Sequence, residues 1–95
     1  MSAPTAVERR FMAAAVALGC MACRQEGNET PAEFHHWRRY GYRKNLFGYG
    51  LCGPHHRQTA AIKGILNRHG DPKEFAAKYG SDETLFNELK IIMEK

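Results

Sequence analysis

The sequence predicts a small α+β fold, in which a short ββα unit is held by a metal ion and flanked by helices at both ends. Two features predict it. Cysteine and histidine recur as two closely spaced pairs, Cys20-x-x-Cys23 and Cys52-x-x-His55, and residues 24–51 between them are enough for a hairpin. Amphipathic helical patterns precede and follow this segment. A chain of 95 residues buries a limited core, so a metal staple would supply stability that it lacks.

An N-terminal helix is expected over residues 5–18. Thr5 and Glu8 have the spacing of a capping box, and Gly19 follows as a stop. The apolar residues expected to share one face of this helix are Val7, Phe11, Ala14 and Leu18.

The same segment permits a second interpretation. Arg9 and Arg10 precede the weakly apolar run 11–18 and then Cys20, an order also found in bacterial signal peptides, including those of lipoproteins. The capping box favours the helix, and cleavage before Cys20 would modify a residue suited to bind metal. Whether the intact N-terminal peptide appears in a mass spectrum distinguishes the two.

The middle of the chain, residues 19–70, is expected to hold two metal knuckles around the ββα unit. Residues 34–37 are predicted as a strand and residues 45–51 as the strand that returns, with an exposed basic loop at 38–44 between them. After the second knuckle, the segment from His56 to about Leu66 has helical composition, weakened by Gly64.

The last quarter, residues 71–95, is expected to form two helices. Asp71, Pro72 and Glu74 mark the start of one, which ends at Gly80 with Phe75, Ala76 and Tyr79 on one side. Ser81 caps the final helix, whose apolar stripe is expected to pack into the core and consists of Leu85, Phe86, Leu89, Ile92 and Met93. With no repeat or linker, residues 1–95 are interpreted as one domain.

Composition and charge narrow the class of protein. Apolar residues make up 43% and charged residues 25%, which excludes long disorder, collagen and multi-pass membrane proteins. The net charge of +4 is uneven: residues 1–70 carry ten Lys and Arg against four Glu, whereas residues 71–95 carry four Lys against six acids. A basic body indicates a polyanionic partner, although a solvated basic surface remains an alternative.

The knuckles are typical of a structural zinc site. Zinc prefers four tetrahedral nitrogen and sulfur ligands, and a two-residue gap lets one turn supply two of them. Three cysteines cannot all pair with one another, so a reducing compartment fits better than an oxidising one. The alternative is two unrelated turns with buried cysteines.

Four of the five histidines form two adjacent pairs, His35-His36 and His55-His56. On a strand, His35 and His36 point to opposite faces. If His55 faces zinc, His56 projects elsewhere, toward whichever member of the first pair faces it. This predicts a second, open site where imidazoles serve as base or metal ligands. The alternatives are extra zinc ligands or surface histidines; the lone His69 is interpreted as structural or exposed.

The segment 37–44 combines four cations with three aromatic residues. Cations pair with phosphates, and aromatic rings stack on unpaired bases. The alternative is an exposed charged loop whose aromatic residues anchor it to the core.

These residues together resemble a known family. The motifs are Ala17-Leu18-Gly19-Cys20-x-x-Cys23, then Pro31-Ala32-Glu33-Phe34-His35-His36, then Leu51-Cys52-Gly53-Pro54-His55-His56-Arg57. They resemble the HNH, or ββα-metal, endonucleases, and more closely the phage recombination-enhancement nucleases of the Ref type, which are described as RecA-dependent. The continuation Phe75-Ala76-Ala77-Lys78-Tyr79-Gly80 and the helix after it are also similar, so the resemblance spans about Val16 to Met93.

The resemblance implies a role for each motif residue. Structural zinc would be held by Cys20, Cys23, Cys52 and His55. His36 would be the general base and Asn45 the residue that orients it. His35 and His56, the latter opening a helix, would hold the catalytic ion, Mg²⁺ or Mn²⁺. The expected phosphate contacts are Arg38, Arg39, Arg43, Lys44 and Arg57. Many relatives have aspartate where this chain has His35, and imidazole ligands favour softer ions such as manganese, nickel or zinc.

The function implied is a metal-dependent DNA endonuclease that leaves 5′-phosphate ends and acts in recombination or DNA processing, in the cytoplasm of a bacterial host and with host RecA filaments as a partner. A zinc-stabilised module that binds nucleic acid or protein without cutting is the alternative. Such a module has no use for a histidine like His36 that is free of both metals.

Overall fold

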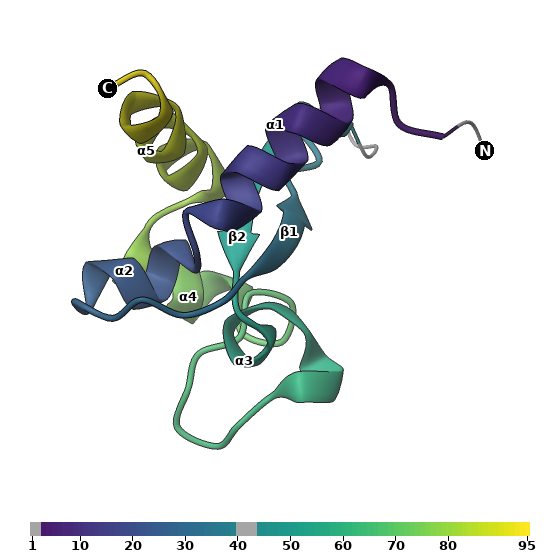
Figure 1. Ribbon diagram of the computed structural model, residues 1–95. Coiled ribbons are helices and arrows are strands. Elements are labelled where there is room, and N and C mark those ends of the chain that lie inside the picture. Colours follow the sequence, from purple (N-terminus) through teal and green to yellow (C-terminus); the bar gives the residue numbers. More distant parts are fainter. Residues whose placement is uncertain (1–2, 40–43) are drawn as a thin grey trace.

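The structure is a computed structural model that describes residues 3–39 and 44–95 (Figure 1). In this part of the chain the elements follow the order α1 (Ala6–Ala17), α2 (Met21–Gln25), β1 (Glu33–His36), β2 (Gly48–Leu51), α3 (Gly53–His56), the 3₁₀ turn η1 (Gln58–Ala60), α4 (Pro72–Tyr79) and α5 (Asp82–Met93). The predicted α+β fold is therefore confirmed, with a ββα unit between terminal helices.

The two strands form an antiparallel hairpin at the centre of the molecule. Glu33 pairs with Leu51 and His36 with Gly48. All four residues of β2 are buried, because α1, α2 and α5 pack around this strand (Figure 1). Gly50 explains how α1 comes so close: a Cβ there would stand 2.7 Å from the carbonyl oxygen of Gly19. The buried strand fixes the position of the histidines on β1.

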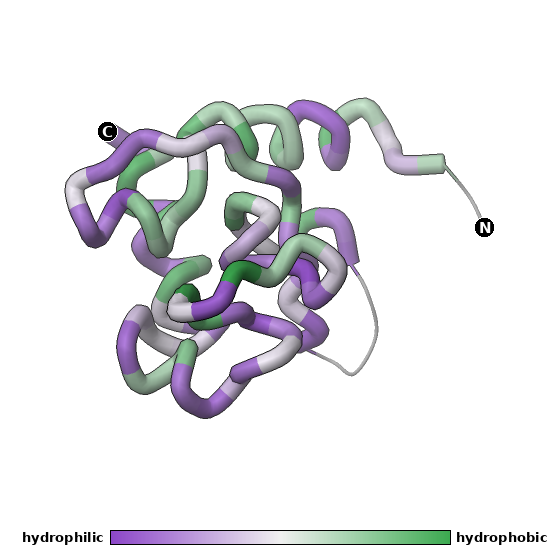
Figure 2. Tube along the Cα trace, turned by 90° about the horizontal axis from the view of Figure 1, so that it is seen from below, coloured by the Kyte–Doolittle hydropathy of each residue, from purple (hydrophilic) through white to green (hydrophobic). Residues whose placement is uncertain are grey.

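Helix α1 begins at the predicted capping box. The Thr5 hydroxyl accepts from the Glu8 backbone N–H, and the Glu8 carboxylate accepts from the Thr5 backbone N–H. The predicted apolar face was partly wrong: Val7 and Ala14 are exposed, and Ala15 is buried. Figure 1 shows the reason for Val7, since the first turns of α1 project beyond the sheet. In Figure 2 a hydrophilic stretch interrupts this otherwise hydrophobic helix near the same end.

The helix expected from His56 to about Leu66 is not formed. Helix α3 ends at His56, which therefore closes this helix rather than opening it, and Arg57 is extended (φ −109°, ψ 136°). The buried side chain of Asn67 donates to the carbonyl oxygens of Pro54 (3.0 Å) and Arg57 (2.8 Å). Because these bonds tie the later chain back onto α3, residues 57–71 fold into a loop.

The two C-terminal helices start and stop where the sequence predicts. Gly80 ends α4 with φ +117°, and the Ser81 hydroxyl caps α5 by accepting from the Thr84 backbone N–H at 3.1 Å. Asp71 does not cap α4, because its carboxylate accepts from the Asn67 backbone N–H instead. Ala76, expected on the packed side of α4, is exposed.

The stripe of α5 packs into the core as predicted. Leu85 and Leu89 are fully buried, and Ile92 and Met93 pack against the same cluster. The largest fully buried core residues include Tyr49, Leu51, Phe75 and Met21. In the described ranges, no helix is long and apolar enough to cross a membrane.

Two candidate metal centres and the histidine cleft

Four buried side chains from two separate turns meet at the first centre, which we call the closed cluster: Cys20, Cys23, Cys52 and His55. Cys20 caps α2, and its sulfur accepts from the Cys23 backbone N–H at 3.4 Å, which brings both sulfurs to one side of the turn. Cys52 precedes α3, and His55 follows one turn later. The four ligand atoms lie within 4.8 Å of one another.

The geometry of the closed cluster fits a tetrahedral zinc ion. Zinc bonds of about 2.3 Å to sulfur and about 2.0 Å to nitrogen give edges of about 3.8 Å between sulfurs and about 3.5 Å between sulfur and nitrogen. Cys23 Sγ lies 3.8 Å from Cys52 Sγ, and Nδ1 of His55 lies 3.6, 3.5 and 3.1 Å from the sulfurs of Cys20, Cys23 and Cys52. This Cys₃His group could therefore hold a metal ion such as zinc.

A hydrogen-bond chain on the far side of His55 supports this assignment. Nε2 of His55 lies 3.2 Å from the Tyr79 hydroxyl, which donates to Glu26 Oε1 at 3.3 Å. Donation from Nε2–H to the tyrosine oxygen leaves Nδ1 unprotonated toward the sulfurs, the form that binds metal. Burial raises the pKa of the Cys20 thiol to about 12 and also raises the pKa of Cys52. A metal ion replaces those protons and offsets the cost of burying the charged thiolates.

Three imidazoles form a second group, the open cluster: His35 from β1, His56 from α3 and His69 from the following loop. Their ring centroids lie 5.0 to 5.3 Å apart. His35 is buried, His56 is half-buried and His69 is exposed, so the group faces solvent on one side. Burial lowers the pKa of each of the three, which favours the neutral form that binds metal.

His35 gives the clearest indication that the open cluster is suited to bind an ion. Both of its ring nitrogens are buried and neither has a hydrogen-bond partner. Nε2 lies 3.4 Å from Asp82 Oδ1, outside hydrogen-bond geometry. Buried polar atoms are seldom left without a hydrogen-bond partner. A group of three imidazoles, one of them without such partners, is therefore the set of ligands expected around a bound ion.

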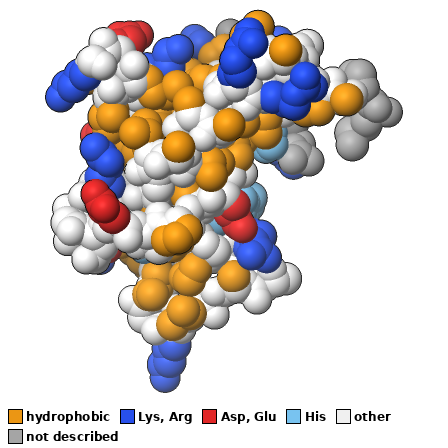
Figure 3. Space-filling view, in the orientation of Figure 1, with side chains coloured by type: hydrophobic (Ala, Val, Ile, Leu, Met, Phe, Trp, Pro, Cys, Tyr) orange, Lys and Arg blue, Asp and Glu red, His pale blue; other side chains and the backbone are white. Residues whose placement is uncertain are grey.

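The next imidazole, His56, is oriented by a carboxylate. Its Nδ1 lies 2.6 Å from Glu33 Oε1, which also accepts from Nε of Arg57 at 2.5 Å. The bond from Arg57, with the neighbouring His56, lowers the pKa of Glu33. If Nδ1–H donates to an ionised Glu33, Nε2 of His56 is left unprotonated and available to the open cluster. Figure 3 shows histidine side chains reaching the surface below α1, some beside acidic and basic groups.

His36 points to the opposite face of β1 from His35, and its ring packs edge-on against Phe34 at 4.9 Å. Nε2 of His36 lies 2.9 Å from Asn45 Oδ1. The side chain of Asn45 also contacts the Glu8 carboxylate, one of the interactions that lower the pKa of Glu8. The structure thus brings His36 and Asn45 together and keeps both apart from the closed cluster.

His69 is the site residue that sequence reasoning missed. It was interpreted as structural or exposed because it stands alone, outside both adjacent pairs. The turn that brings it back depends on Asn67, whose Oδ1 accepts from the backbone N–H groups of His69 (3.1 Å) and Gly70 (2.8 Å). The Asn-x-His-Gly order is the only sequence signal for this turn, and it does not indicate what the turn approaches.

The cations expected to contact phosphate are placed differently from one another. Arg38, Arg39 and Lys44 are exposed, and Arg39 lies over the rings of Trp37 and Phe47 at 5.5 and 5.6 Å. Arg57 is half exposed but paired with Glu33. Arg43 lies outside the described residues. The ring of Trp37 packs against Phe47 and Phe86, which favours an anchoring role for this aromatic side chain.

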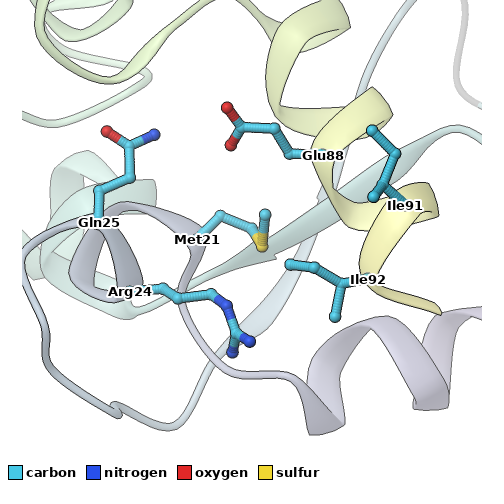
Figure 4. A pocket seen from close by; sticks show the side chains of 6 residues that line it. All are labelled: Met21, Arg24, Gln25, Glu88, Ile91 and Ile92. Carbon is cyan, nitrogen blue, oxygen red and sulfur yellow. The ribbon is translucent and has the colours of Figure 1, made fainter. Parts of the chain in front are cut away.

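Two hollows differ in chemistry. One, of about 200 Å³, is lined by the open cluster, by His36 and by two further side chains. Its lining residues are Phe34, His35, His36, Arg38, His56 and His69. We call it the histidine cleft. The other, of about 300 Å³, lies between α2 and α5 and is lined by Met21, Arg24, Gln25, Glu88, Ile91 and Ile92 (Figure 4). Its floor is aliphatic and it holds none of the metal-ligand groups found in the described residues, so the histidine cleft is the candidate site.

Comparison with known proteins identifies a family for this chain. Residues 4–93 match the family model described as recombination enhancement, RecA-dependent nuclease. No curated protein matches the chain. The match covers both clusters, the histidine cleft and all the helices that support them. Because the family model spans nearly the whole sequence, the chain belongs to the family of RecA-dependent nucleases of recombination enhancement.

Proposed function

We propose that the chain is a metal-dependent DNA endonuclease of the HNH type, with the histidine cleft as its active site. The observation that carries the proposal is that His36 and the open cluster line the same cleft. The ring of His36 is hydrogen-bonded to the side-chain amide of Asn45. A base beside a cation site is what phosphodiester hydrolysis requires. The family description supports a nuclease acting in recombination.

In this proposal His36 is the general base. A hydrogen bond from Nε2–H to Asn45 Oδ1 selects the tautomer in which Nδ1 carries a lone pair. Nδ1 then accepts a proton from the attacking water, and Asn45 fixes the direction in which the ring faces. The two adjacent histidines would have different roles. Because side chains alternate along β1, His35 would face the ion and His36 would face the attacking water.

The open cluster would hold the divalent ion through His35, His56 and His69. Such an ion supplies a Lewis acid that neutralises charge on the phosphodiester and on the leaving 3′ oxygen. The fit depends on the orphaned nitrogens of His35 and on the carboxylate behind His56. Three imidazoles favour Mn²⁺ or another transition ion over Mg²⁺, which prefers oxygen ligands. The closed cluster would hold structural zinc and take no part in the reaction.

The substrate proposed is DNA, with RecA filaments as the context of cleavage. Exposed Arg38 and Arg39 follow the strand that carries His35 and His36, and exposed Lys44 precedes the strand that pairs with it, so they are suited to contact phosphates near the cut. The proposal includes Arg43 by sequence alone. Cleavage that leaves 5′-phosphate ends, and an origin in phage, belong to the same proposal and follow from the sequence resemblance.

The test is cleavage of plasmid and single-stranded DNA by the pure protein with Mg²⁺ or Mn²⁺, repeated on RecA filaments. His36→Ala runs beside the wild type, with zinc content and the circular dichroism spectrum showing that the variant is folded. Loss of a general base lowers the rate by about 10² to 10⁴-fold, so His36→Ala is expected to cut at least 100-fold more slowly.

Equal cleavage by wild type and His36→Ala would remove His36 from the reaction. If the folded, zinc-loaded wild type binds DNA yet cuts none of these substrates with either ion, the chain is a binding module and the nuclease proposal is wrong.

A further inference from the structure

We propose that Asp82, contributed by the last helix, is a positioning residue that holds His35 in the orientation and tautomer needed to bind the divalent ion. This inference rests on the proposed function only in taking the open cluster as an ion site. Asp82 lies outside the ββα unit and is 46 positions beyond the end of β1, so no motif of the unit includes it.

The Asp82 carboxylate sits at a convergence of polar groups next to the open cluster. The Tyr49 hydroxyl donates to Oδ1 at 2.6 Å, and Arg68 donates to both oxygens, from Nε at 2.9 Å and from Nη2 at 2.8 Å. The side chain of Asp82 is only 13% exposed. The guanidinium of Arg68, which donates to both carboxylate oxygens, favours the ionised form of Asp82. Asp82 is therefore an anion held in one place.

Among the described residues around this anion, His35 is the one that is left unsatisfied. Its Nε2 lies 3.4 Å from Oδ1, while Nδ1 has no hydrogen-bond partner. A fixed anion 3.4 Å from Nε2 favours the tautomer that carries its proton there, because the positive end of an N–H is stabilised by a nearby negative charge. Nδ1 then keeps its lone pair for the ion.

The second imidazole of the cluster provides an independent precedent within the same molecule. His56 has a carboxylate, Glu33, on one nitrogen and the cluster on the other side. Asp82 likewise places a carboxylate beside His35, on Nε2 and at 3.4 Å, longer than the 2.6 Å contact between His56 and Glu33. Carboxylates behind metal-binding imidazoles fix the ring and raise its basicity, and removing one typically weakens metal binding by about 10 to 100-fold.

A purely structural role for Asp82 is the competing explanation, because its pairing with Arg68 and Tyr49 also anchors α5 to the loop and the sheet. Tyr49→Phe separates the two roles. It removes one anchoring bond to Asp82 and keeps the aromatic ring, which packs 5.1 Å from the ring of His35. A structural role predicts that Tyr49→Phe and Asp82→Asn weaken ion binding alike.

The experiment measures Mn²⁺ binding without DNA, from the electron paramagnetic resonance signal of the free ion, on zinc-loaded wild type, Asp82→Asn and Tyr49→Phe. Asp82→Asn is expected to raise the Mn²⁺ dissociation constant at least 10-fold, and Tyr49→Phe less than 3-fold. In zinc-loaded wild type without Mn²⁺ at the open cluster, the two-bond ¹⁵N–¹H spectrum of the histidine rings should show the His35 proton on Nε2. This second readout needs no variant, so it stands even if Asp82→Asn does not fold.

The proposal is overturned if His35 carries its proton on Nδ1, if Asp82→Asn binds Mn²⁺ as the wild type does, or if Tyr49→Phe weakens binding as much. Failure of the proposed function looks different. A wild type that binds Mn²⁺ with the expected dependence on Asp82 but cuts no DNA would leave Asp82 as a positioning residue of a site that is not a nuclease.

Discussion

The closed and open clusters are built from the same kinds of side chain yet differ in almost everything around them. The closed cluster takes four ligands from two short turns and buries all four. The open cluster takes three ligands from a strand, a helix and a loop, and only His35 is buried. Four buried ligands complete a tetrahedral shell, whereas three ligands facing solvent leave positions for water or substrate.

The groups behind the ligands differ in the same way. In the closed cluster, His55 is backed by the neutral hydroxyl of Tyr79. In the open cluster, His56 is backed by the carboxylate of Glu33, and Asp82 lies beside His35. Carboxylates make imidazoles more basic and strengthen their hold on an ion that has few protein ligands. The two clusters therefore differ in two ways. The closed cluster has more ligands and buries them, whereas the open cluster, proposed for catalysis, has carboxylates beside its imidazoles.

The largest expected effect comes from breaking the closed cluster. Cys52→Ser removes one of four buried ligands. Structural zinc contributes about 10 kcal/mol or more to folding in zinc-finger peptides, which equals or exceeds the whole stability of a small domain. We expect the variant to lose its folded circular dichroism spectrum and its bound zinc.

The matched variant in the open cluster is His56→Ala. It should keep one zinc per chain and a cooperative thermal transition, while losing Mn²⁺ binding. The distinction between the centres would be wrong if Cys52→Ser stayed folded, or if His56→Ala unfolded the chain as completely as Cys52→Ser.

A smaller effect is expected from the exposed member of the open cluster. His69→Ala should raise the Mn²⁺ dissociation constant about 10-fold, because two protein ligands remain, and cleavage should recover when Mn²⁺ is saturating. The free energy of unfolding should change by less than about 0.5 kcal/mol, as for other surface substitutions. Titration of Mn²⁺ and urea denaturation measure the two effects. An unchanged Mn²⁺ affinity would mean that His35 and His56 hold the ion alone.

How far the sequence predicts the molecule depends on how local each feature is. The capping box at Thr5, the stop at Gly80 and the cap at Ser81 act within one turn, and the helices they bound are found as predicted. The segment from His56 to about Leu66 was expected to be helical, but its fold depends on Asn67, which bonds to Pro54 in α3 and to Arg57, 13 and 10 residues back. Composition cannot report such a bond.

The candidate site shows the same division. Spacing alone predicts the closed cluster, since each pair of ligands is three residues apart. The alternation of a strand and the orientation of the knuckle also predict that His56 approaches one member of the first histidine pair, and the resemblance implies that this member is His35. His69 and Asp82 could not be found this way: the first reaches the site through a turn set by Asn67, and the second through a helix that packs from the far end of the chain.

The smallest expected effect tests whether the group behind the closed cluster matters only for stability. Tyr79→Phe removes the hydroxyl that lies 3.2 Å from Nε2 of His55 and donates to Glu26 at 3.3 Å. A buried N–H left without a partner costs about 1 kcal/mol or somewhat more, so the free energy of unfolding in zinc-buffered urea should fall by that amount. Lys78→Ala is the control, because it removes the exposed ion pair to the same Glu26 and the contact of Lys78 with the Tyr79 ring but leaves the Tyr79 hydroxyl in place, so it should change stability little. Cleavage per folded molecule and Mn²⁺ affinity should match the wild type in both variants. A loss of Mn²⁺ affinity in folded Tyr79→Phe would show that the two centres are coupled through α3, where His55 and His56 are neighbours, and the division between a structural and a catalytic centre would fail there first.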